Sequence, residues 1–88
     1  MCDVNFDKAV EDVKNLKQSP KDDELLEIYA LFKQATVGDV NTAKPGLFDL
    51  KGKAKWEAWN GKKGMSVADA KEAYVTLVNK LVSNYGLK

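Results

Sequence analysis

The last quarter of the chain holds the strictest apolar periodicity in the sequence. Apolar side chains recur there at steps of three and four residues: Ala70, Ala73, Tyr74, Leu77, Val78, Leu81, Val82 and Tyr85. This spacing places them on one face of an α-helix. Ser66 followed by Asp69 is typical of a helix start, and Gly86 is typical of a helix end. The segment is therefore predicted to be a long helix that buries one face.

Three earlier segments carry a similar pattern, and no segment has a convincing strand pattern. A first helix is predicted over residues 4–17, with a stripe formed by Phe6, Ala9, Val10, Val13 and Leu16. A second helix starts within residues 19–22 and ends before Gly38, and a short third helix covers residues 52–62. A chain of 88 residues is one domain, residues 1–88. The prediction is an all-α four-helix bundle.

The connection between the second and third helices is about as long as a loop gets in a compact domain. Residues 39–50 contain several turn formers, with Asp39, Asn41 and the pair Pro45-Gly46. Three apolar side chains are expected to pin this loop to the bundle: Leu47, Phe48 and Leu50. A long ordered loop favours a functional role for this part of the chain.

Charge is distributed unevenly along the chain, although the net charge is only +1. Residues 1–31 hold 4 lysines and 8 acidic residues, whereas residues 32–63 hold 7 lysines and 3 acidic residues. The sequence has no arginine, so any phosphate would be bound by lysine point charges. A weak basic balance without arginine argues against a nucleic-acid partner.

Catalytic and metal-binding chemistry has little support in the sequence. The chain lacks histidine, the commonest general base and metal ligand. Its one cysteine, Cys2, allows no internal disulfide, which fits a reducing compartment. No run of about 18 apolar residues occurs, so stable membrane insertion is not expected. We expect a cytoplasmic, monomeric binding protein that has no catalytic activity, metal ion or cofactor.

Pairs of side chains at helical spacing are the best candidates for a ligand site. On a helix Tyr29 and Lys33 share one face, as do Lys51 and Lys55. A phenol and an ammonium group could bind one phosphate, and a ring could flank a flat base. Spacing alone favours a simpler interpretation, in which Tyr29 is a core residue and Lys33 is solvated. The same reasoning makes core anchors of the two tryptophans, Trp56 and Trp59.

The sequence also resembles the acyl-CoA-binding protein family, also called the diazepam-binding inhibitor family. Three separated blocks carry the resemblance: YALFKQATVG at 29–38, KPG at 44–46 and KGKAKWEAWN at 51–60. The similarity runs from FDKAVEDVKNLK at 6–17 to AYVTLVNKLVSNYG at 73–86, nearly the whole chain. It implies an up-down-down-up four-helix bundle. It also implies a non-catalytic cytosolic carrier and buffer of medium- and long-chain fatty acyl-CoA esters, such as palmitoyl-CoA.

The resemblance further implies a set of binding residues. The family holds the 3′-phosphate of the CoA ribose with a tyrosine and lysines, which correspond here to Tyr29, Lys33, Lys55 and Lys14. Lys51 shares the predicted helical face of Lys55 and is included with them. Contacts near the adenine correspond to Phe32 and Tyr74. The acyl and pantetheine path corresponds to Ala9, Val10, Leu25, Leu26 and Ala54.

One departure from the family and one alternative function bear on these expectations. Phe32 stands where many members have tyrosine, so a hydrogen bond from that ring is lost while stacking on adenine is retained. The alternative function is a protein-interaction module or signalling peptide, motivated by the acidic stretch 1–31. In that case, charge reversal at three acidic residues should abolish partner binding: Asp7, Glu11 and Asp12.

Overall fold

The computed structural model describes the backbone of residues 2–88 and the side chains of residues 4–88. Four α-helices occupy this part of the chain, and none of it forms a named strand. They are α1 (Cys2–Lys14), α2 (Asp22–Thr36), α3 (Leu50–Asn60) and α4 (Val67–Tyr85). The predicted all-α four-helix bundle is therefore confirmed.

The first and third helices begin and end earlier than predicted, for local reasons. After α1 the chain pairs with the C-terminus: Lys17 N–H donates to the Gly86 carbonyl at 2.9 Å, and Lys88 N–H to the Asn15 carbonyl at 2.8 Å. Residues 15–17 therefore leave the helix. The third helix begins at Leu50 because the Asp49 carboxylate accepts the Gly52 N–H at 3.0 Å, which caps the helix N-terminus.

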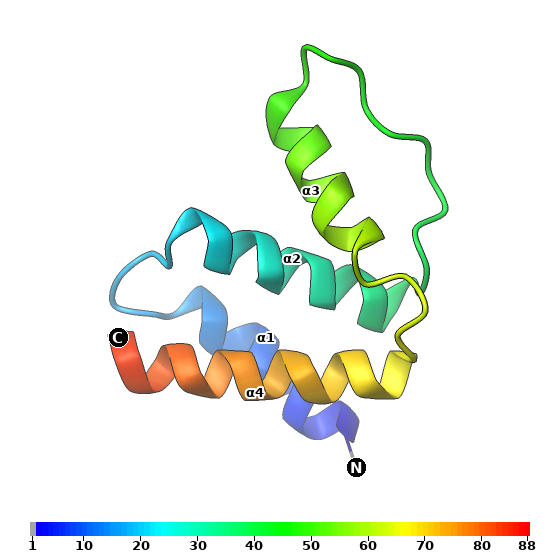
Figure 1. The fold of residues 1–88 in the computed structure, drawn as a ribbon. Helices are drawn as coiled ribbons and strands as arrows, with labels where there is room; N and C mark the ends of the chain where they lie inside the picture. Colours follow the sequence, from blue (N-terminus) through cyan, green and yellow to red (C-terminus); the bar gives the residue numbers. More distant parts are fainter. Residues whose placement is uncertain (1) are drawn as a thin grey trace.

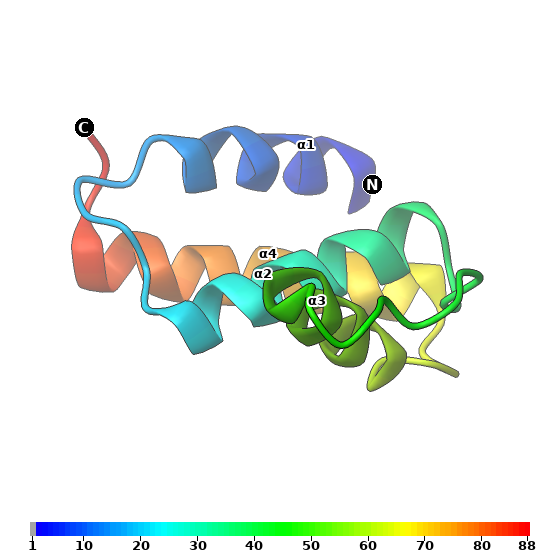
Figure 2. The ribbon, with the colours of Figure 1, turned by 90° about the horizontal axis from the view of Figure 1, so that it is seen from above.

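The helices pack in the order α1, α4, α2, α3 (Figures 1 and 2). The pairing of Leu16 with Leu87 joins the ends of α1 and α4, which run in the same direction. Helix α2 runs opposite to α4, and α3 rises from the far side of α2 (Figure 1). The molecule is flat, with extents of 37 × 28 × 14 Å. The arm formed by α3 and the loop before it lies on the side of α2 that faces away from α1 (Figure 2).

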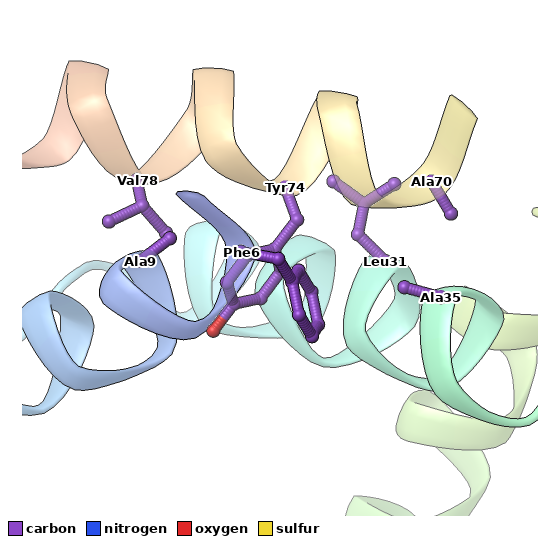
Figure 3. Packing of buried hydrophobic residues seen from close by; sticks show 7 residues of the cluster. All are labelled: Phe6, Ala9, Leu31, Ala35, Ala70, Tyr74 and Val78. Atoms are coloured by element: carbon purple, nitrogen blue, oxygen red, sulfur yellow. The ribbon is translucent and has the colours of Figure 1, made fainter. Parts of the chain in front are cut away.

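The core lies between α1, α2 and α4 (Figure 3). The ring of Phe6 on α1 meets the ring of Tyr74 on α4, with centroids 5.0 Å apart and planes tilted by 56°. Small residues allow the helices to approach around these rings: Ala9, Ala35 and Ala70. Each large side chain buried in this way stabilises the fold by about 1.5–3 kcal/mol. Phe6, Ala9, Ala70 and Tyr74 belong to the apolar stripes that the sequence predicts.

Hydrogen bonds from two buried side chains hold α3 beside α2. The indole of Trp59, 4% exposed, donates to the Gly38 carbonyl at 2.8 Å. The buried Gln34 amide donates to Asp39 Oδ1 at 2.9 Å and to the Met65 carbonyl at 2.8 Å. The Gly64 N–H donates to the same Asp39 oxygen at 2.9 Å. The bond from Gly64 and, to a smaller extent, the bond from Gln34 hold the pKa of Asp39 below its ordinary value.

A further contact joins the start of α2 to the end of α4. The Tyr85 hydroxyl donates to Glu24 Oε1 at 2.7 Å, and the Lys21 N–H donates to the same oxygen at 2.9 Å. The hydrogen bond from Tyr85, followed by the backbone bond from Lys21, lowers the pKa of Glu24. The same Tyr85–Glu24 hydrogen bond raises the pKa of Tyr85. Together with the terminal pairing, this contact fixes the end of the bundle from which α2 starts.

The expectation that apolar side chains pin the long loop is wrong. Leu47 is 77% exposed, Phe48 101% and Leu50 73%. A turn at residues 46–49 and the start of α3 place them at the far end of the arm, away from the core. The loop is held instead by Trp56, whose indole donates to the Thr42 carbonyl at 2.8 Å, and by the ion pair of Lys44 with Glu57 at 3.0 Å. No helix within residues 2–88 has both the length and the apolar character needed to cross a bilayer.

Candidate functional site

A groove of about 470 Å³ lies between the first halves of α2 and α3. We call it the α2–α3 groove, and its lining residues are Asp22, Leu25, Leu26, Leu50, Lys51, Ala54 and Lys55. The two helices run parallel, because residues 22–26 face residues 50–55 here while Lys33 faces Trp59 further along. The groove therefore has aliphatic walls and a rim that carries two lysines and one aspartate.

Five of these seven residues are among the binding residues that the resemblance implies, and the other two, Asp22 and Leu50, are not. Both could have been found from helical spacing, since Asp22 lies one turn before Leu26 and Leu50 one turn before Ala54. The sequence pattern places Asp22 at the start of the second helix and Leu50 in the loop. The earlier start of α3 is what brings Leu50 onto the face of the groove.

A strip of lysines and rings continues from the groove along the contact between α2 and α3. The Lys55 Nζ lies 5.5 Å from the centre of the Tyr29 ring, and the Lys33 Nζ lies 5.0 Å from the centre of the Trp59 ring. We call these four residues the cation–ring strip. An electron-rich ring face attracts a cation by about 0.5–1 kcal/mol at an exposed site. The rings therefore hold two ammonium groups at the contact between α2 and α3, one from Lys33 on α2 and one from Lys55 on α3.

The contacts of the strip define the environments of the Tyr29 and Lys33 side chains. Tyr29 is half-buried and has a lysine from the neighbouring helix over its ring. Lys33 is also half-buried and rests on a buried tryptophan, so it is not an ordinary solvated lysine. Trp59 is a core anchor, as the sequence indicates, and it also positions a cation, whereas Trp56, for which the same role is expected, is only half-buried. Two lysines of the strip and Lys51 on the groove rim form a positive surface that adjoins an apolar one.

Three aromatic rings meet on the other side of α2. Phe32 lies 6.1 Å from Phe6 and 6.2 Å from Tyr74, measured between ring centroids. Burial raises the pKa of Tyr74 to about 12, because desolvation disfavours the charged phenolate. Phe32 is only half-buried, so part of its side chain remains available for contact with a flat group.

The remaining residues implied by the resemblance lie on α1, apart from the groove. Figure 2 shows α1 and α3 on opposite sides of α2. Ala9 is buried in the core beside Val78, and Val10 packs against the same core. Lys14 is exposed at the end of α1, with its Nζ 3.4 Å from a Glu11 carboxylate oxygen. None of these three lines the α2–α3 groove, so their binding roles stay predictions from the resemblance.

A flat helical bundle with a lysine-rimmed apolar groove belongs to the class of small all-α ligand-binding domains. The family model for acyl-CoA-binding protein matches residues 3–78, and the chain belongs to that family. It is 61% identical over 83 residues to acyl-CoA-binding protein homolog 1 of Caenorhabditis elegans, covering 94% of this chain and 96% of that protein.

Two further relatives agree in sequence and in fold. The chain is 59% identical over 85 residues to the acyl-CoA-binding protein homolog of Drosophila melanogaster, covering 97% of this chain and 99% of that protein. The crystal structure of Oryza sativa acyl-CoA-binding protein 2 superposes with a TM-score of 0.91 at 37% identity, covering 96% of this chain and 93% of that one. The family and the fold expected from the sequence are therefore confirmed.

Proposed function

We propose that this protein is a non-catalytic cytoplasmic carrier and buffer of medium- and long-chain fatty acyl-CoA esters, acting as a monomer. The observation that carries the proposal is the continuity of two surfaces. The cation–ring strip, with Tyr29, Lys33 and Lys55, runs directly into the aliphatic walls of the α2–α3 groove. A fatty acyl-CoA ester has the matching design, because a phosphorylated head is joined to an apolar tail.

The head of the ligand would meet the lysines and the rings. Lys33 and Lys55, with the Tyr29 hydroxyl, bind the 3′-phosphate as point charges and a hydrogen-bond donor, and Lys14 contributes from α1. The half-buried Phe32 stacks on adenine, with Tyr74 behind it. Pre-set lysines strengthen such a site, since less side-chain freedom is lost on binding.

The tail of the ligand would enter the groove between Leu25, Leu26 and Ala54. Each methylene removed from water contributes about 0.8 kcal/mol, so a 16-carbon chain offers about 12 kcal/mol before costs. Immobilising the ligand offsets several kcal/mol or more of that gain. Affinity should therefore rise with chain length, whereas the lysines select CoA esters over free fatty acids.

The proposal that the protein is not catalytic rests on the kinds of side chain that it contains. A sequence without histidine lacks the commonest general base. Within the described residues, the side chains that line the groove are aliphatic, lysine and aspartate, and the aliphatic ones carry no group that transfers a proton. Binding and release are the reactions that such a surface supports.

Calorimetry with three ligands tests the proposal. Palmitoyl-CoA should bind most tightly, because it uses both the strip and the groove. CoA lacks the tail and palmitate lacks the phosphate, so each should bind at least about 100-fold more weakly, a loss of about 2.7 kcal/mol. Palmitate binding as tightly as palmitoyl-CoA would overturn the assignment.

The alternative of a protein-interaction module finds less support on the acidic first helix. Lys8 pairs with Asp12 at 2.7 Å and Lys14 pairs with Glu11 at 3.4 Å, so part of the negative charge of α1 is already neutralised. A pull-down with ligand-free protein, repeated after charge reversal at Asp7, Glu11 and Asp12, tests this alternative. Retention of a partner that depends on those three acids would support it.

A further inference from the structure

Three apolar side chains stand in solvent at the far end of the α3 arm. Leu47, Phe48 and Leu50, which we call the apolar lip, are the three most exposed large apolar residues described. Large apolar residues exposed together mark an interaction surface more often than scattered ones do. The loop carries the lip without burying it, although the loop itself is held by Trp56 and by the Lys44 ion pair.

The apolar lip is continuous with the mouth of the α2–α3 groove. Leu50 belongs to both, and Leu25 on the opposite wall of the groove is 45% exposed. An occupant that covers the lip would therefore touch the opening of the groove as well. This places the lip where an acyl chain would enter or leave.

The lip is also surrounded by positive charge. Between residues 44 and 55 the chain has four lysines and one acid, Asp49. The Asp49 carboxylate is turned to the Gly52 N–H as a helix cap. Lys51 and Lys53 follow directly on α3, whereas Lys44 pairs with Glu57. Apolar side chains followed by lysines on the same arm match an anionic lipid surface, in which acyl chains lie beneath negative headgroups.

We infer that the apolar lip docks this protein on anionic bilayers, with the mouth of the groove facing the lipid. Leu47 and Phe48 enter the interface, and Lys51 and Lys53 lie at the level of the headgroups. The docking stands on the exposed lip alone. Its use in loading an acyl chain rests on the proposed function, because only an acyl-CoA carrier has cargo to exchange with a membrane.

Vesicle binding of the ligand-free protein tests the docking. Cosedimentation is measured with vesicles of phosphatidylcholine alone and of equal parts phosphatidylcholine and phosphatidylserine, at low salt. The parent protein should bind the anionic vesicles at least about tenfold more strongly. The double variant Leu47→Ser/Phe48→Ser should bind them at least about tenfold more weakly than the parent.

A matched control removes the same number of exposed apolar side chains elsewhere. Val4→Ser/Val67→Ser changes residues that are 72% and 44% exposed on α1 and α4, away from the lip. This control should keep vesicle binding within about twofold of the parent. Lys53→Glu should weaken binding to the anionic vesicles and leave binding to the neutral ones unchanged.

Three outcomes overturn the inference. The lipid assignment fails if the parent does not bind anionic vesicles, or if the lip variant binds them like the parent. It also fails if sedimentation equilibrium shows a parent dimer that the lip variant dissociates, since a second copy would then be the occupant. Circular dichroism should show native helix content in every variant, because the altered side chains lie outside the core.

Calorimetry with palmitoyl-CoA separates this inference from the proposed function. The lip variant should keep the parent affinity, because neither Leu47 nor Phe48 lines the groove. Failure of the parent to bind palmitoyl-CoA would overturn the carrier function and leave the docking result standing. Normal palmitoyl-CoA binding without vesicle binding would overturn only the docking.

Discussion

The α1–α4–α2 layer and the α3 arm are stabilised by different means. The layer buries rings and aliphatic side chains from three helices, including Phe6, Leu31 and Val78. The arm buries one residue of α3, Trp59, and is held to the layer mainly by hydrogen bonds at its base. The candidate site lies at the junction, where one wall is fixed by the core and the other is the lightly packed α3. Ligand affinity should therefore respond to changes in the arm that barely alter the core.

The largest effect on the free energy of unfolding is expected from removing a buried side chain of the layer. Leu31→Ala should lower the free energy of unfolding by about 2–5 kcal/mol, because Leu31 is 2% exposed and its removal leaves a cavity. Leu47→Ala on the arm should change it by less than about 0.5 kcal/mol. Urea unfolding followed by circular dichroism measures both. Similar losses in the two variants would contradict the division into a packed layer and a light arm.

A smaller effect is expected from loosening the base of the arm. Trp59→Phe removes the indole donor to the Gly38 carbonyl and the preferred ring beneath Lys33, and should cost about 1–3 kcal/mol of unfolding free energy. Palmitoyl-CoA affinity should fall in parallel, since α3 carries one wall of the groove. Trp56→Phe is the control, because its indole bonds to the exposed loop residue Thr42. An equal loss in both variants would indicate that the loop, rather than the base, positions α3.

The helices of the layer are predictable from the sequence, because their buried residues recur with the period of an α-helix. Residues such as Ala70, Tyr74 and Val78 recur at three and four residues, and the same residues are buried. Helix boundaries were less predictable where a partner distant in sequence decides them. Residues 15–17 leave α1 because they pair with the C-terminus, which no local pattern indicates.

The arm was harder to predict because apolar character alone does not determine burial. Leu47 and Phe48 look like anchors in a sequence, yet the long loop carries them beyond the reach of the core. Periodicity put Tyr29 and Lys33 on one face, but it could not pair Lys55 with Tyr29 or Lys33 with Trp59. Those pairs depend on the parallel packing of α2 and α3, which was implied only by the family resemblance.

A change within the cation–ring strip should affect affinity more than stability. Lys33→Ala should weaken palmitoyl-CoA binding by about 1–3 kcal/mol, because a charged hydrogen bond to phosphate is lost. Its effect on unfolding should be no more than about 1 kcal/mol, the usual limit for a cation over a ring at a partly exposed site. Lys53→Ala, on the same arm but outside the groove lining, serves as the control. A Lys33→Ala protein that is folded and binds like the parent would remove Lys33 from the phosphate site.

The smallest effect is expected from acid titration at the base of the arm. The N–H of Gly64, and then the Gln34 amide, hold the pKa of Asp39 below its ordinary value of 3.8. The unfolded chain therefore binds this proton more readily than the folded one. The stability that Asp39 contributes is complete above pH 3.8 and is lost as the pH falls through the lowered folded value.

Urea unfolding at a series of pH values tests this through Asp39→Asn. The variant cannot titrate at this position, so its unfolding free energy should fall less steeply below pH 3.8 than that of the parent. Gln34→Leu, which keeps the carboxylate but removes the second donor, should give an intermediate slope. Because the slope compares each protein with itself, a general loss of stability in either variant does not mimic the effect. Identical slopes in the parent and Asp39→Asn would show that this carboxylate does not couple proton binding to the attachment of α3.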